Sequence, residues 1–262
     1  MTAPQRIVCL TEETVETLYL LGQEDRIVGV TGYAVRPKRV RQEKPRVGAF
    51  TSADIPKILA LRPDLVLTFS DLQADIASEL IRAGIEVMAF NQRDVAGILR
   101  MIRMLGRLTD CSDRAEALAQ GFETRIATLR AHAADHRPRV YFEEWDDPMI
   151  TSIGWASDLI EIAGGTDCFA HLRHEASAKD RIVTSRDVID AAPDIIVASW
   201  CGKKVRPEKI AARPGWDVIP AVAQNRIVEI KSPLILQPGP AALSDGLDAL
   251  IAAIFPKDVP AC

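Results

Sequence analysis

One sequence pattern occurs twice in this chain, first as Asp54-Ile-Pro-Lys-Ile-Leu-Ala-Leu-Arg-Pro-Asp-Leu-Val-Leu67 and again as Thr184-Ser-Arg-Asp-Val-Ile-Asp-Ala-Ala-Pro-Asp-Ile-Ile-Val197. In each copy a polar residue precedes a short apolar helix, Pro-Asp ends the helix, and a run of Leu or β-branched residues follows as a strand. Helix, Pro-Asp turn and strand is also common turn chemistry. Two copies without a gap favour two α/β lobes built on the same plan.

The residues around the first copy alternate between strands and helices. Short turns between such elements imply parallel pairing and right-handed crossovers. The run Leu65–Phe69 is continuously apolar, which is typical of a strand buried on both faces. Expected strands are Arg6–Leu10, Ile27–Thr31, Leu65–Phe69 and Glu86–Phe90, and expected helices are Thr11–Gly22, Asp54–Leu61 and Asp75–Ala83.

The middle of the chain has helical periodicity and no strand pattern. Apolar residues recur at helical spacing in Asp94–Leu108 and again in Ser112–Asp135. The second helix would be on the order of 35 Å long. The sequence therefore predicts three parts: an N-terminal α/β lobe (1–92), a helical spacer with the long linking helix (93–137), and a C-terminal α/β lobe (138–262).

Strands and helices alternate again after the spacer. This second alternation again predicts a parallel sheet covered by helices. Expected strands are Arg139–Glu143, Ile195–Ser199 and Arg226–Ile230, and expected helices are Ser157–Ala163, Thr184–Ala192 and Pro240–Ile254.

Composition excludes several classes of protein. The 262 residues are 48% hydrophobic with a net charge of −4, which argues against disorder and against nucleic acid as a partner. No apolar run reaches the roughly 20 residues of a membrane span, so membrane insertion is not expected. Five scattered cysteines without a CxxC pair, and no leader pattern after Met1, predict a cytoplasmic protein. A periplasmic location is the alternative if a leader has been removed.

Several segments, taken in order, resemble one family. They include Arg6-Ile-Val-Cys-Leu10, Ile27-Val-Gly-Val-Thr31, Leu159-Ile-Glu-Ile-Ala-Gly-Gly165 and Trp216-Asp-Val-Ile-Pro220, together with the doubled pattern above. Their order and spacing resemble the class III solute-binding proteins of ABC importers, which carry cobalamin, haem or ferric siderophores, and within it most of all the cobalamin-binding proteins. The resemblance implies two Rossmann-like lobes with central parallel sheets, joined by a long rigid helix, and a cobalamin or related corrinoid in the cleft between the lobes.

The positions expected to dock on a membrane partner depart from the family pattern. The resemblance implies one carboxylate on each lobe, near the start of the helix before Pro-Asp, but these positions hold Pro56 and Arg186. Asp54 and Asp187 are the nearest acids that could substitute. A reversed charge is repulsive toward such a partner. Docking on ABC importer membrane subunits is therefore doubtful, and a cytoplasmic corrinoid binder is the expectation.

The candidate ligand-binding residues follow the expected strands, because ligands of α/β lobes collect at the carboxyl ends of strands. Aromatic faces suit a flat macrocycle, and a few polar groups would orient it. The acidic residues Glu143–Asp147 could accept hydrogen bonds from ligand amides or bind a hard cation. Core packing for the indoles and a solvated loop for the lysines are the alternatives. The candidates are Tyr33, Phe50, Phe69, Glu144, Trp145, Trp155, Trp200, Cys201, Lys203, Lys204 and Gln237.

Catalytic and metal sites are not expected. GxSxG, HExxH, P-loop and GxGxxG motifs are missing, so the chain is predicted to bind without catalysis. Cys168-x-x-His171-x-x-His174 lacks zinc-site spacing, although either histidine could contact a cobalt or haem iron. Two alternatives stay open: a ferric-siderophore or haem carrier using Arg36, Arg39 and Arg41, and an enzyme of modified fold with Cys201 or an acid of 143–147 as its reactive group.

Overall fold

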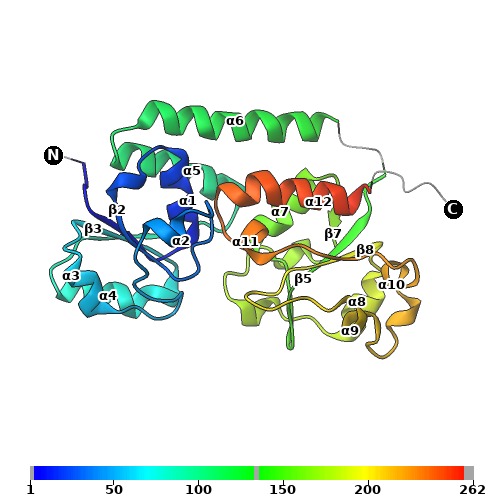
Figure 1. The fold of residues 1–262 in the computed structure, drawn as a ribbon. Helices are drawn as coiled ribbons and strands as arrows, with labels where there is room; N and C mark the ends of the chain where they lie inside the picture. Colours follow the sequence, from blue (N-terminus) through cyan, green and yellow to red (C-terminus); the bar gives the residue numbers. More distant parts are fainter. Residues whose placement is uncertain (1–2, 133–135, 257–262) are drawn as a thin grey trace. The chain divides into compact units, whose positions relative to one another are not determined.

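The computed structural model describes residues 3–132 and 136–256. The chain forms two compact units (Figure 1). The first comprises the chain up to Gln92 together with Ala96–Gly121, and the second comprises Arg93–Val95 and the chain from Phe122 onward. The predicted mixed α/β class with parallel sheets is confirmed in both units.

The first unit is built on a four-stranded parallel sheet in the order β2-β1-β3-β4. Its two central strands are completely buried, which explains why their sequences are continuously apolar. Val8 and Val66 lie side by side in register, and both contact a core that includes Leu10, Ile58 and Leu80. The strands are β1 (Ile7–Cys9), β2 (Ile27–Val30), β3 (Leu65–Phe69) and β4 (Val87–Phe90).

Helices connect these strands and begin and end where the sequence provides caps. Gly22, just after the first helix, has a φ of +64°, which glycine adopts without strain. The Asp54 carboxylate caps the third helix by accepting a hydrogen bond of 3.0 Å from the backbone N–H of Lys57. The helices are α1 (Glu12–Leu20), α2 (Val40–Glu43), α3 (Ile55–Ala60), α4 (Ala74–Arg82), α5 (Val95–Leu108) and α6 (Ser112–Ala131), and short 3-10 turns cover Glu24–Arg26 and Asp71–Gln73.

The two helices of the predicted spacer are present. The α6 helix has 20 residues and contributes to both units, since the division falls between Gly121 and Phe122. The sequence pattern predicts that this helix extends to Asp135, and residues 133–135 lie outside the described part of the chain. Within the described ranges, no helix combines the length and the apolar character needed to cross a bilayer.

The second unit has a mixed sheet centred on β5 (Arg139–Asp146), which is longer than the predicted Arg139–Glu143. On one side β5 pairs in parallel with β8 (Ile195–Ala198), and β8 with β9 (Ile227–Glu229). On its other side β5 pairs in parallel with β7 (Thr166–Asp167) near its start and antiparallel with β6 (Met149–Thr151) near its end. This β5–β6 hairpin was not predicted, because Met149-Ile-Thr151 is too short to show a strand pattern.

Helices cover both faces of this sheet (Figure 1). The predicted helix Pro240–Ile254 is instead a π-helical turn (Ala242–Gly246) followed by α12 (Leu247–Ile254). Gly246 allows the backbone of Leu234 to approach this segment closely, since a Cβ there would lie 2.3 Å from the carbonyl oxygen of Leu234. The other helices are α7 (Gly154–Ile162), α8 (Ser185–Ala191), α9 (Pro207–Ala211), α10 (Pro220–Ala223) and α11 (Ser232–Ile235), with 3-10 turns at Ala170–Leu172, Ala178–Arg181 and Trp216–Val218.

An aromatic cluster forms the core beneath one face of the sheet. Tyr141 meets Phe169 and Trp216 edge-on, with ring centroids 5.7 and 6.2 Å apart. Trp216 is fully buried and donates a hydrogen bond of 2.7 Å to the Ser185 hydroxyl at the start of α8. This core therefore fixes the segment from Arg213 to Trp216 beside the central strand, which positions the groups described next.

Candidate functional site

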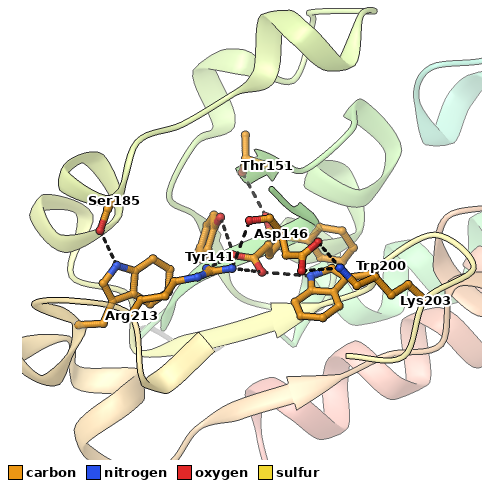
Figure 2. Close-up of polar contacts among 10 residues, drawn as sticks. Tyr141, Asp146, Thr151, Ser185, Trp200, Lys203 and Arg213 are labelled. Atoms are coloured by element: carbon orange, nitrogen blue, oxygen red, sulfur yellow. Dashed lines mark hydrogen bonds and ion pairs between the residues drawn. The ribbon is translucent and has the colours of Figure 1, made fainter. Parts of the chain in front are cut away.

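A fully buried carboxylate lies near the carboxyl end of β5. Glu143 is paired with Arg213 in a two-pronged ion pair, with Nη1–Oε2 and Nη2–Oε1 distances of 2.5 and 3.0 Å. Its oxygens also accept hydrogen bonds of 3.1 Å from the indole N–H of Trp200 and the phenol of Tyr141 (Figure 2). Buried charge is tolerated when it is paired and hydrogen-bonded in this way. Glu143 thereby joins β5, the end of β8 and the segment after α9.

The electrostatics of this cluster are consistent with its hydrogen bonds. Burial, and then the neighbouring charge of Glu143, raise the pKa of Tyr141 well above its usual value. The phenol therefore stays protonated and donates a hydrogen bond to Glu143. Burial lowers the pKa of Arg213, but its bonds to Glu143 outweigh this and the net pKa is raised. Arg213 also stacks 4.6 Å above the ring of Trp216, so its charge and its position are both fixed.

Next along the strand, Asp146 holds the ammonium of Lys203. The Nζ atom lies 2.6 and 2.8 Å from the two carboxylate oxygens. It also lies 4.9 Å from the ring centroid of Trp200 and 5.2 Å from that of Trp145, within the range of cation–π attraction. Trp145, Trp200 and Lys203, three residues predicted to bind ligand, are thus brought together. Figure 2 shows Lys203 between Asp146 and Trp200.

The Glu144 carboxylate forms an ion pair with a buried arginine. Arg181 is 1% exposed and donates from Nη1 to the Glu144 carboxylate at 2.6 Å and to the Thr151 carbonyl. This pair ties the β5–β6 hairpin to the 3-10 turn at Ala178–Arg181. Sequence reasoning did not find Arg181 or Arg213, because both follow irregular segments whose position relative to the sheet no local pattern reveals.

The carboxyl edge of the first unit is organised by another residue that the sequence did not reveal. Gln73 is 1% exposed, accepts a hydrogen bond of 2.9 Å from the Phe69 backbone, and donates to the carbonyls of Phe50 and Leu10 at 2.7 and 3.1 Å. Three separate segments are therefore held together by one amide. Phe69 is buried and Phe50 half-buried, whereas Tyr33, after β2, is 52% exposed.

The remaining predicted residues are more dispersed. Trp155 is buried at the start of α7 and donates to the Ile235 carbonyl at 2.9 Å, so it packs in the core of the second unit. Gln237 is half-buried just after α11. Cys201 and Lys204 are exposed on the loop that follows β8, on either side of Gly202 and Lys203.

His171, Arg36 and Arg39 contact other side chains of the protein. No group of three or more His, Cys, Asp or Glu within the described part of the chain could hold a metal ion. The ring of His171 lies 6.2 Å from that of Phe169, and burial raises the pKa of the Cys168 thiol to about 12. Arg36 pairs with Glu16 at 2.7 Å, and Arg39 pairs with Glu24 and Glu43 at 2.8 and 3.0 Å.

The acids near the expected docking positions serve as helix caps. The Asp54 carboxylate caps α3, as described, and the Asp187 carboxylate accepts 2.7 Å hydrogen bonds from the backbone and hydroxyl of Thr184. Arg186 is exposed and pairs with Asp190 one turn away at 2.9 Å. The capping bonds hold both carboxylates against their own helix ends, so both have a structural role there.

Comparison with known proteins places these features in context. A family described as "Periplasmic binding protein" matches residues 7–234. An uncharacterized ABC transporter substrate-binding lipoprotein of Bacillus subtilis is 27% identical over 97% of this chain and 81% of its own length. A vitamin B12-binding protein of Yersinia pseudotuberculosis is 25% identical over 85% of this chain and 79% of its own length.

Solved structures share the fold over nearly the whole chain. A possible iron-binding periplasmic protein of Staphylococcus epidermidis superposes with a TM-score of 0.82, at 22% identity, and covers 97% of this chain and 100% of its own. The periplasmic haem-binding protein of Roseiflexus has a TM-score of 0.80, 24% identity and coverage of 96% and 99%. The periplasmic vitamin B12-binding protein of Vibrio cholerae has a TM-score of 0.77, 22% identity and coverage of 97% and 98%.

The expectation of a cytoplasmic location is wrong. The Bacillus subtilis relative is a lipoprotein, and the matching family is described as periplasmic. The scattered cysteines had suggested a reducing compartment, yet a chain of this size folds without disulfides in either compartment. Cys9 is buried, Cys111 and Cys168 are partly buried, and Cys201 is exposed. These thiols are therefore no indicator of the compartment.

Proposed function

The chain belongs to the periplasmic binding protein family, and from this premise we propose that it delivers a corrinoid to an ABC importer without catalysing a reaction. Members of the family are solute-binding components of such importers. Several relatives at 25% identity are named vitamin B12-binding or cobalamin-binding proteins. These names support a corrinoid as the solute.

The observation that carries the proposal is the balance of charge around the indoles of the second unit. Three cations there already have an acidic partner: Arg213 with Glu143, Arg181 with Glu144, and Lys203 with Asp146. Such a neutral, aromatic edge suits a large flat ligand whose rim carries uncharged amides. A highly anionic ferric siderophore would instead require guanidinium groups that are not already engaged.

The ligand contacts proposed in the first unit are Tyr33, Phe50 and Phe69. Phe69 ends β3 and Tyr33 follows β2, at the edge where α/β lobes bind ligands, and Gln73 links the Phe50 carbonyl to the Phe69 backbone. In the second unit the proposed contacts are Trp145, Trp200, Cys201 and Lys204, while the Lys203 ammonium lies over the two indoles. Gln237 and Glu144 are proposed to contribute hydrogen bonds at the periphery, and the position of Trp155 favours support of α7 over contact with ligand.

Haem is the second candidate, and one residue favours it. The Tyr33 side chain is 52% exposed beyond the end of β2, and a phenolate oxygen is an axial ligand that haem iron accepts. Several similar structures are named haem-binding proteins. A siderophore has less support, because the Arg36 and Arg39 side chains are paired with glutamates.

Equilibrium binding to cyanocobalamin, haemin and a ferric catecholate siderophore tests the proposal. We expect saturable 1:1 binding of cyanocobalamin, and a Trp145→Ala variant that binds about three- to tenfold more weakly because an aromatic contact is lost. Phe255→Ala is the matched control, since Phe255 is also an exposed aromatic residue of the second unit. Haemin binding with a Soret shift, and no binding of cyanocobalamin, would transfer the proposal to haem.

A further inference from the structure

The ammonium of Lys203 covers the indole surfaces on which a flat ligand would stack. Its Nζ atom is 4.9 Å from the Trp200 ring and 5.2 Å from the Trp145 ring, and Asp146 fixes it there at 2.6 Å. Trp200 is only 2% exposed, although it follows β8 and precedes an exposed loop. The lysine is therefore part of what shields this indole from solvent.

The backbone after β8 is shaped to return the lysine to this position. Gly202 has a φ of +68°, and the Lys203 backbone N–H donates to the Trp200 carbonyl at 3.3 Å, which closes a tight turn. A Cβ at Gly202 would meet no atom within 4 Å. The glycine is thus required by the turn and not by crowding, and the turn directs Lys203 back toward Asp146.

The contact that holds Lys203 is weak enough to be displaced. The Lys203 side chain is 48% exposed and that of Asp146 is 18% exposed, so solvent screens the ion pair. Exposed ion pairs and cation–π contacts each change an equilibrium by about a factor of two to five. A ligand that covers both indoles can compensate for such a loss.

Asp146 decides which ligands can replace the lysine. Once the ammonium leaves, this mostly buried carboxylate needs another donor, because an unsatisfied acceptor is costly. We propose that Lys203 is a displaceable cover of the Trp145–Trp200 surface, and that an amide-rimmed ligand binds by stacking on the indoles while its amide N–H groups replace the ammonium on Asp146. This inference rests on the proposed corrinoid function. A carboxylate-rimmed ligand such as haem has the opposite requirement, since its propionates attract Lys203.

Two measurements on Lys203→Met test the cover. Methionine keeps the length of the stem but removes the charge, and Lys209→Met on α9 is the control because Lys209 is also exposed in the same unit. Cyanocobalamin should bind Lys203→Met about fivefold more tightly than the wild type. High salt should strengthen binding to the wild type but not to Lys203→Met. The control should match the wild type in both measurements.

Quenching of tryptophan emission by acrylamide measures the cover without any ligand. Lys203→Ala, which removes the stem as well as the charge, should show a higher quenching constant than the wild type and the matched control Lys209→Ala. Unchanged quenching overturns the cover, as does weaker or unchanged cyanocobalamin binding by Lys203→Met when the wild type binds. If neither protein binds cyanocobalamin, the corrinoid function fails, and quenching alone then decides whether Lys203 covers the indoles.

Discussion

Replacing Arg213 with methionine removes the charge partner of a carboxylate that has no exposed surface. Glu143 would keep the hydrogen bonds from Tyr141 and Trp200, but two of its four polar contacts come from the Arg213 guanidinium. Methionine keeps an apolar stem against Trp216, so packing is largely preserved. The perturbation is therefore mainly an uncompensated buried charge.

The expected loss follows from the burial of this pair. Breaking a buried ion pair by removing one partner costs about 3–5 kcal/mol, because the remaining charge stays desolvated. Replacing both partners avoids this penalty, so Glu143→Gln/Arg213→Met should be more stable than Arg213→Met alone. We expect a coupling energy of about 2 kcal/mol or more from the double-mutant cycle.

Urea unfolding followed by tryptophan emission is the appropriate assay. The four tryptophans are Trp145, Trp155, Trp200 and Trp216, and all belong to the second unit, so the signal reports on the unit that contains the network. Circular dichroism at 222 nm provides the signal of the whole chain. Arg186→Met is the control, because Arg186 is highly exposed and its ion pair with Asp190 is a surface pair. A loss of less than about 1 kcal/mol in the free energy of unfolding of Arg213→Met would refute the role of the network. It would also be refuted if the effects of the two single substitutions added up to that of the double variant.

Three further predictions concern the rest of the chain. Burial raises the pKa of Glu12 to about 7 and that of Glu13 to about 8. The stability that their neutral forms contribute is therefore complete below about pH 4.5 and is lost as the pH rises through 7 to 8. Glu13→Gln should flatten this decline of Tm with pH, and an unchanged profile would contradict the prediction. Thr184→Ala removes the capping box of α8 and should cost about 1 kcal/mol in urea unfolding, with no change in ligand affinity. Gly154→Ala would bring a Cβ within 2.2 Å of the Arg93 carbonyl oxygen, and should lower stability by about 1–3 kcal/mol; a Tm equal to the wild type would show that this backbone moves apart easily.

The parts of the fold that the sequence predicted are those governed by local rules. Leu65–Phe69 was predicted with its observed bounds, because a buried parallel strand is apolar throughout and Pro63 ends the preceding helix. The caps at Asp54 and Thr184 also act where the sequence placed them. The doubled pattern indicated two α/β lobes, and the resemblance to a known family implied the same architecture.

The site was only partly predictable, because its key contacts join distant segments. Trp145, Trp200 and Lys203 were identified from their place after strands, and they do lie together. Glu143 was regarded only as part of an acidic loop, whereas it is the buried partner of Arg213, 70 residues away. No local pattern encodes such a pair.

Gln73 shows the same limit in the first unit. Its sequence neighbours indicate the start of a helix, and nothing in the sequence indicates that its amide reaches Leu10, 63 residues earlier. A buried polar residue is informative only when its partners are known, since the same glutamine on a surface would have no structural role.

The strand order has a consequence for how the chain folds during synthesis. In the first unit β1 pairs with β2 on one side, but its other neighbour β3 follows only after an interval in which Arg6 is 58 residues from its partner Asp64. One side of this central strand therefore stays unpaired until β3 has been made. In the second unit β5 meets β6 across a short turn, and this hairpin can close at once. Parallel pairing requires distant residues to meet and is slow. The β5–β6 hairpin therefore offers the second unit a local starting point, whereas every pairing in the sheet of the first unit is parallel and needs a crossover connection.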